Sequence, residues 1–343
     1  MSAISSDVAI IGAGPVGIFA VFALGQLGLS SIVVDALHEA GGQCAALYPE
    51  KPIYDIPSRP SVSGAGLIDD LLRQSEPYAP AYRLGRRVET LRERDGRYEL
   101  GLSDGTQIEA GAVLVAAGAG AFGPNRPPLD GIEAYEGHSV FYSVRTAERF
   151  RGKRVVIAGG GDSAADWAVF LADIAASVTL VHRRPVFRAA PGTVAALERL
   201  ARGGRVTIAA PRTLEGLEGS DARLERVLVR SPDDAVEALP CDALLCFFGL
   251  AKDLSALAGW DLAADRHGIP VDPATMATRR PGIFAIGDIA RYSGKLKLIL
   301  SGFAEAASAA HAARAHLRPG IVFHSEYSTS RGRPGLEAAL EVR

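Results

Sequence analysis

The sequence has little of what builds disulfide frameworks, nucleic-acid surfaces or membrane spans. Only three of the 343 residues are cysteines, Cys44, Cys241 and Cys246, and no two of them form a CxxC pair. Such a chain fits a reducing compartment. The formal net charge of −2 gives no overall attraction to nucleic acid or to an anionic membrane surface. We therefore expect a cytoplasmic protein that binds neither nucleic acid nor membrane.

Residues 8–29 carry no charge and could be mistaken for a signal peptide or a membrane span. No lysine or arginine precedes this stretch, since the first is Lys51, and glycines interrupt it at turn spacing. A buried strand, a turn and a helix explain it better. Hydrophobic content of 48 %, 38 glycines and 22 % charged residues also fit a folded α/β protein, and 343 residues suffice for two domains.

A pattern of strand, glycine turn and apolar helix occurs twice, at 8–27 and at 154–175. Each copy is followed by a second strand-like run, at 31–35 and 177–182, so we predict two βαβ units. A hairpin is predicted from 98–102 and 107–109, a buried strand at 112–117, and a linker at 122–128. Further core strands are predicted at 243–248 and 282–286, and a helix at 298–317.

The first glycine turn reads Gly12-Ala-Gly14-Pro15-Val-Gly17 and opens the predicted helix. Its glycines allow a tight turn, close approach to a pyrophosphate, and close packing of helix on strand. The helix N-terminus offers free N–H groups to the phosphates. Asp35 ends the next strand, where an acid accepts a hydrogen bond from a ribose hydroxyl.

The second turn reads Gly159-Gly-Gly161-Asp162-Ser163-Ala164, and no acid ends its next strand. The chain has basic residues there instead, because it continues as His182-Arg183-Arg184-Pro-Val-Phe-Arg188. Guanidinium groups bind phosphate through forked, charge-assisted hydrogen bonds, so NADP is predicted rather than NAD. Two nucleotide sites can exchange hydride only through a bridging redox group, which predicts FAD in the first. Asp288, after a core strand, is placed to hold a ribitol hydroxyl of that FAD.

In this order, the motifs GAGPVG, Gly41-Gly42-Gln43, GGGDSA, HRRxxFR and GIFAIGD resemble the thioredoxin reductase branch of two-dinucleotide flavoproteins. The resemblance covers nearly the whole chain. It implies an α/β fold of two Rossmann-like dinucleotide-binding domains, with Gln43 among the cofactor-binding residues. The FAD domain would comprise 1–120 and 251–343, and the NADPH domain 121–250, joined by two strands that act as a hinge.

Thioredoxin reductases have a CxxC before the second glycine turn, where this chain has Ser139-Val-Phe-Tyr-Ser-Val-Arg-Thr. Without a dithiol, electrons cannot pass to a disulfide by thiol exchange. The chain is then similar to the ferredoxin–NADP⁺ reductases of thioredoxin reductase type, which are homodimers. That resemblance implies Tyr48 against one flavin face and His324, or alternatively Tyr327, from the partner subunit over the other.

The resemblance implies that NADPH gives hydride to flavin N5 and that single electrons then pass to ferredoxin or flavodoxin. Ser325 is expected to tune N5 by hydrogen bonding, and no metal site is predicted. Such carriers are acidic, so Arg291, Lys295 and Lys297 are candidates for docking them. Two alternatives stay open: an NADPH-dependent reductase of a quinone, a ferric chelate or oxygen, and a flavin- and NADPH-binding sensor without turnover.

Overall fold

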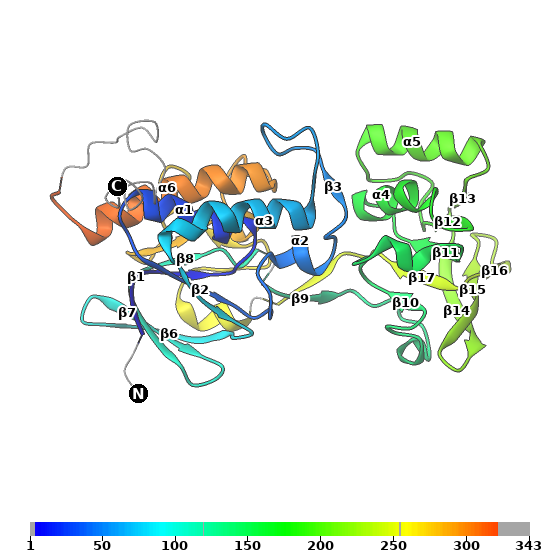
Figure 1. Ribbon diagram of the computed structural model, residues 1–343. Helices are drawn as coiled ribbons and strands as arrows, with labels where there is room; N and C mark the ends of the chain where they lie inside the picture. The colour runs from blue at the N-terminus through cyan, green and yellow to red at the C-terminus, as the bar shows by residue number, and fades with distance from the viewer. Residues whose placement is uncertain (1–3, 119, 254, 322–343) are drawn as a thin grey trace, which may run out of the picture. The chain divides into compact units, whose positions relative to one another are not determined.

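The computed structural model describes residues 4–118, 120–253 and 255–321, and the chain forms two compact units (Figure 1). The first unit consists of Met1–Phe122 and Lys252–Arg343, and the second is Gly123–Ala251. The chain therefore leaves the first unit once and returns to it once. The two crossings pair as a two-stranded sheet of β9 (Ala121–Pro124) and β18 (Leu250–Asp253), so the first residues of the linker predicted at 122–128 form a strand.

The first unit is built on a mixed sheet in the order β5-β2-β1-β8-β7-β6, with β20 also paired to β8. β1, β2, β5, β8 and β20 pair in parallel, and β6, β7 and the first half of β8 form an antiparallel meander. The strands of this unit are β1 (Ile4–Ile11), β2 (Ser31–Asp35), β3 (Pro52–Ile53), β4 (Val62–Ser63), β5 (Ala81–Leu84), β6 (Val88–Arg94), β7 (Arg97–Leu102), β8 (Gln107–Val115), β19 (Ile269–Pro270), β20 (Ile283–Ala285) and β21 (Ala290–Arg291). Its α-helices are α1 (Pro15–Gln26), α2 (Gly42–Ala46), α3 (Gly64–Ser75) and α6 (Ile299–Leu317).

β8 corrects the prediction of separate strands at 107–109 and 112–117. Its first half pairs with β7 and its second half with β20, without a turn between them. Gly111 interrupts the apolar pattern because a Cβ there would lie 2.4 Å from the side chain of Leu317. The interruption in the sequence therefore reflects helix packing and does not mark a strand end.

Helices cover one face of this sheet, where α1 packs against α3 and α6 (Figure 1). A core of residues from β1, β2, β8, α1 and α6 fills that side. On the other face, side chains of β1, β2 and β8 share a core with those of the β6–β7 end of the same sheet and with the short 3-10 helix η4 (Ser255–Trp260). The buried runs that read as strands in the sequence thus have apolar partners on both faces.

The second unit has a parallel five-stranded sheet in the order β10-β17-β11-β12-β13. α4 packs against α5 and β12, and an antiparallel sheet β14-β15-β16, absent from the sequence prediction, shares the core with the parallel strands. The elements are β10 (Val140–Phe141), β11 (Arg154–Ala158), α4 (Asp162–Leu171), β12 (Ser177–Val181), α5 (Pro191–Arg202), β13 (Val206–Ala209), β14 (Thr213–Ser220), β15 (Arg223–Arg230), β16 (Val236–Pro240) and β17 (Ala243–Cys246).

Within the described parts of the chain, no helix combines the length and the apolar character needed to cross a membrane. The uncharged stretch at 8–29 is instead divided between β1, the glycine turn and α1.

Candidate functional site

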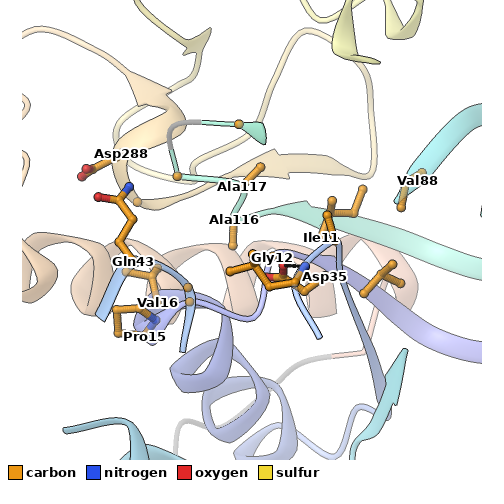
Figure 2. Close-up of a pocket in the computed structure, with 18 of the residues that line it drawn as sticks. Ile11, Gly12, Pro15, Val16, Asp35, Gln43, Val88, Ala116, Ala117 and Asp288 are labelled. Atoms are coloured by element: carbon orange, nitrogen blue, oxygen red, sulfur yellow. Dashed lines mark hydrogen bonds between the residues drawn. The ribbon is translucent and has the colours of Figure 1, made fainter. Parts of the chain in front are cut away.

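A cavity of about 630 Å³ opens in the first unit where β1, β2 and β8 end (Figure 2). Carboxyl ends of parallel strands are the usual place for a ligand site in such sheets. The glycine turn after β1, the end of β2 and the start of α2 line the cavity. Residues 86–89, the end of β8, η4 and residues 287–288 and 297–299 complete its wall.

The three glycines of the first turn serve different purposes. Gly12 has φ +113°, and a Cβ there would lie 2.3 Å from the carbonyl oxygen of Ala116 on the neighbouring strand. Gly17 is buried, and its Cβ would lie 1.9 Å from the Gly12 oxygen, so it allows α1 to approach β1. Gly14 would carry its Cβ into open space, and it lines the cavity together with Pro15. The turn therefore leaves room for a ligand at Gly14, while Gly17 contributes packing.

Asp35 closes the turn from the end of β2. Its Oδ2 accepts a hydrogen bond from the Ala13 backbone N–H at 2.6 Å, and its Oδ1 accepts one from Leu37 N–H at 2.8 Å. Burial raises the pKa of this carboxyl, and the two N–H donors oppose that shift. Each oxygen keeps a lone pair for another donor in the cavity, which suits a ligand hydroxyl.

Gln43, Cys44, Tyr48 and Asp288 line the opposite end of the cavity, and in Figure 2 Gln43 and Asp288 project toward the same region. Tyr48 is half-buried, and the Cys44 thiol donates to its hydroxyl oxygen at 3.7 Å. Burial, with added repulsion from Cys44 and Asp288, raises the pKa of Tyr48, so its phenol stays protonated. This end presents an amide, a phenol and a carboxylate to a ligand.

The sequence analysis missed several lining residues because they reach the cavity from distant segments. Arg86 and Arg87 come from the turn before β6 and Glu89 from its start, and Leu257 and Trp260 come from η4, late in the chain. Trp260 is only 3 % exposed, which is expected of a tryptophan and does not by itself indicate a ligand site. No motif connects these residues with the glycine turn.

The second glycine turn, in the other unit, repeats the construction of the first. Gly159 has φ +156°, and its Cβ would lie 2.7 Å from the Phe247 oxygen and 2.8 Å from the Ala164 side chain. Gly161 has open space around its Cβ position, as Gly14 has. Ala164 is fully buried and takes the packing place of Gly17. α4 begins directly after Gly161 with no side-chain cap, so its first N–H groups stay open to an anion.

His182 packs against the second glycine turn at Gly160. Its ring lies directly against Gly160, where a Cβ would come within 2.1 Å of it, and stacks on Phe187 at 5.4 Å between centroids. Burial lowers the pKa of His182 and so favours its neutral ring, whose buried Nε2 has no hydrogen-bond partner among the described residues. The Arg188 N–H donates to the Gly160 oxygen at 2.7 Å and ties the basic loop to the turn.

The predicted phosphate-binding side chains Arg183, Arg184 and Arg188 are exposed beside this turn. Among the described residues, the structure records no ion pair for these three guanidinium groups. Asp162 is exposed and accepts a hydrogen bond from Ala190 N–H at 2.8 Å, and Ser163 is exposed beside it. The loop therefore presents cations next to a helix N-terminus.

Three of the predicted residues, His324, Ser325 and Tyr327, lie outside the described residues.

The basic residues after Asp288 divide into two kinds. Lys297 is exposed and lines the cavity, and Arg291 forms a surface ion pair with Asp265 at 3.5 Å. Lys295 corrects the prediction, because its side chain is only 6 % exposed and pairs with the buried Glu305, so it cannot dock a partner.

All three cysteines are free and buried. Burial raises the pKa of the Cys44 thiol, and it raises the pKa values of Cys241 and Cys246 to about 12 each. Thiols with such pKa values carry almost no thiolate at neutral pH and are poor nucleophiles. The three cysteines therefore serve as packing residues.

Comparison with known proteins places this geometry in a family. The model of the pyridine nucleotide-disulphide oxidoreductases matches residues 6–316. The chain is 56 % identical to a ferredoxin–NADP reductase of Paramagnetospirillum magneticum over 96 % of its own length and 98 % of the relative's. It is 54 % identical to a ferredoxin–NADP reductase of Rhodospirillum rubrum, with 97 % and 98 % covered.

Solved structures give the same fold at lower identity. A thioredoxin reductase of T. acidophilum matches with a TM-score of 0.80 at 23 % identity, with 91 % of this chain and 98 % of that chain covered. A thioredoxin reductase of Lactococcus lactis matches with a TM-score of 0.79 at 22 % identity, with 91 % and 99 % covered. The predicted fold class and family are thus confirmed, and the chain belongs to the ferredoxin–NADP reductases of the pyridine nucleotide-disulphide oxidoreductase family.

Proposed function

We propose that this protein is an FAD-dependent reductase that transfers electrons between NADPH and ferredoxin, or flavodoxin in its place. The observation that carries the proposal is identity above 50 % over nearly the whole chain to proteins named ferredoxin–NADP reductase. The two glycine turns suit such a reaction, because each can hold a nucleotide and they differ in the charge of the residues beside them. A carboxylate stands beside the first turn and guanidinium groups stand beside the second.

FAD fits the cavity of the first unit. The open space at Gly14 and the uncapped N-terminus of α1 suit a pyrophosphate. The free lone pairs of Asp35 suit the adenosine ribose, and an added 2′-phosphate there would be repelled by the carboxylate. Gln43, Tyr48 and Asp288 would then face the ribitol and the isoalloxazine ring, which needs a large, partly apolar space. Bound FAD would supply acceptance of hydride and release of single electrons.

NADPH is assigned to the second turn. Its pyrophosphate would lie over Gly161, with the first N–H groups of α4 directed at it. Its 2′-phosphate would be held by Arg183 and Arg184, with Arg188 nearby, since these side chains are exposed and are anchored to the turn through the backbone of residue 188. The roles of individual site residues are part of this proposal.

The protein's own side chains have limited work in the hydride step, because alignment rather than acid–base chemistry governs it. Tyr48, kept protonated, offers a flat surface and a hydroxyl donor at neutral pH. The free, buried thiols make electron transfer through a disulfide chemically unsuitable, which leaves a carrier protein or a small-molecule acceptor. We include a homodimer, with His324 stacking from the partner subunit and Ser325 beside flavin N5, in the proposal.

Assays with one defined acceptor at a time, kept anaerobic except where oxygen itself is the acceptor, test the function. The purified protein, reduced by NADPH, should reduce a bacterial ferredoxin or flavodoxin faster than a quinone, a ferric chelate or oxygen. Preference for one of the small acceptors would favour the alternative reductase. Absence of any turnover, with flavin and NADPH both bound, would identify a sensor.

A further inference from the structure

A buried carboxylate lies behind the wall of the flavin cavity. Glu305 is in the second turn of α6, and its side chain is 4 % exposed. It does not line the cavity itself. The chemistry proposed above assigns it no role, so its burial needs another explanation.

Glu305 is held by three donors. Its Oε2 accepts from the Gly287 backbone N–H at 2.7 Å, and its Oε1 accepts from the Tyr292 hydroxyl at 2.6 Å. The Lys295 ammonium, 6 % exposed, forms an ion pair with the same Oε1. These partners compensate the free-energy cost of burying the Glu305 carboxylate. Burial and the bond to Glu305 raise the pKa of Tyr292 to about 12, so that phenol remains a donor.

The donors belong to two chain segments that both reach the cavity. Gly287 begins the 3-10 turn η5 (Gly287–Ile289), which carries Asp288 into the cavity wall. Lys295 lies in the loop that leads to Lys297, a second wall residue. Gly287 has φ +73° and packs against Val16, with 3.6 Å from its Cβ position to that side chain. Its conformation is left-handed, and its N–H finds its acceptor in Glu305.

We propose that Glu305 is a positioning residue for the flavin: by accepting from Gly287 N–H it fixes the turn that presents Asp288, and through Lys295 it fixes the loop that presents Lys297. Lys295 and Tyr292 neutralise and orient this carboxylate. The inference rests on the proposed binding of FAD in this cavity.

Two double variants separate the acceptor from the ion pair. E305Q/K295M and E305L/K295M both remove the buried charges, and apolar or neutral replacements of a buried pair are often tolerated. Only the glutamine keeps an oxygen for Gly287 N–H. We expect FAD to bind apoprotein of E305Q/K295M within about 3-fold of wild type, and to bind E305L/K295M about 10- to 100-fold more weakly, since a buried donor loses its acceptor.

A matched control lies in the second unit. Glu136 accepts from the Tyr142 hydroxyl at 2.6 Å and pairs with Arg126 at 2.9 Å, so it repeats the tyrosine–glutamate–cation arrangement in the unit that does not form the cavity. E136Q should leave the FAD dissociation constant unchanged. The NADP⁺ dissociation constant should stay the same in both double variants, which separates local positioning from general loss of structure.

The titration is read from the quenching of flavin fluorescence by apoprotein, with the melting temperature measured in parallel. Equal FAD affinity in the two double variants would overturn the inference while wild-type binding still supported the proposed function. Amide hydrogen exchange at Gly287 in the apoprotein gives a readout independent of FAD. It should be markedly faster in E305L/K295M than in E305Q/K295M, and equal rates would overturn the positioning role even if wild type bound no flavin.

Discussion

The two glycine turns of this protein share a backbone plan and differ in what closes them. In both, a first glycine makes the tight turn, a third residue faces open space, and a small buried residue lets the helix approach its strand. The first turn is closed by the carboxylate of Asp35, which bonds to the N–H of Ala13. The second is closed by the His182 ring beneath Gly160 and by a backbone bond from Arg188.

In the proposed assignment, this difference sets the charge that each glycine turn offers to the ribose of its nucleotide. Where a carboxylate closes the turn, it also brings a negative charge that accepts from hydroxyl groups and repels phosphate. Where a neutral ring and the backbone close the turn, the neighbouring guanidinium groups stay exposed for a phosphate. In the proposed assignment, closure and selectivity therefore come from the same few residues, at the end of β2 in the first unit and directly after β12 in the second.

The largest expected effect comes from removing the cations of the second cradle. R183A/R184A should raise the KM for NADPH about 100-fold or more, because two charge-assisted hydrogen bonds to the 2′-phosphate are lost. Turnover with NADH should change little. Steady-state kinetics with both coenzymes measures this, with R202A, an exposed arginine at the end of α5, as the control. Equal losses with NADPH and NADH would contradict the assignment.

The carboxylate of the first cradle should matter for flavin alone. D35N should weaken FAD binding about 10- to 100-fold, because the amide brings N–H donors to a place where the Ala13 N–H and the ribose need an acceptor. NADP⁺ affinity should stay at the wild-type value. Titration of apoprotein with FAD and then with NADP⁺ measures both. Unchanged FAD affinity would remove Asp35 from the site.

Alanine at the open position of each turn should affect one ligand only. Gly14 has φ −72° and Gly161 has φ −100°, so alanine fits both without backbone strain. G14A should weaken FAD about 10-fold and G161A should weaken NADP⁺ similarly, with the free energy of unfolding of the ligand-free protein within ~0.5 kcal/mol of wild type.

G17A provides the contrast, because its Cβ would meet the Gly12 oxygen. It should lower stability by about 1–3 kcal/mol before any ligand is added. Denaturant unfolding of the apoprotein separates the two kinds of glycine. A G14A protein as unstable as G17A would show that the first turn has no free space for a ligand.

The smallest expected effect is a pH dependence of flavin binding. Because burial raises the pKa of Asp35, its protonation begins at a higher pH than that of an exposed aspartate, and FAD affinity should fall a few-fold as the carboxylate is protonated. The contribution of this carboxyl to apoprotein stability has the opposite sign, since a raised folded-state pKa favours folding as the pH falls. In D35N the affinity should be insensitive to pH over this range. A wild-type affinity that rises on acidification would contradict a role for the ionised carboxylate.

Much of the framework could be predicted because its signals are local. The glycine turns, their helices and the strands before and after them follow from apolar runs and turn chemistry over 20 to 30 residues. The helix predicted at 298–317 matches α6, which begins at Ile299. The domain boundaries were predicted at 120/121 and 250/251. The compact units divide one or two residues later, at 122/123 and 251/252.

Other features depend on contacts between distant segments and left no local signal. Trp260 and Arg86 meet at one cavity although 174 positions separate them in the sequence. Lys295 was expected at the surface because lysine usually is, yet a buried glutamate ten residues later pairs with it. The sheet β14-β15-β16 was missed because β14 and β16 are largely exposed and charged residues, such as Glu215 and Arg230, pair across it.

Anaerobic rapid mixing of the purified protein with NADPH, and separately with NADH, tests the central claim most directly. The account predicts a yellow protein whose flavin absorbance bleaches rapidly with NADPH and far more slowly with NADH at the same concentration. A colourless protein that cannot be reconstituted with FAD, or a flavin that bleaches equally fast with both coenzymes, would contradict it.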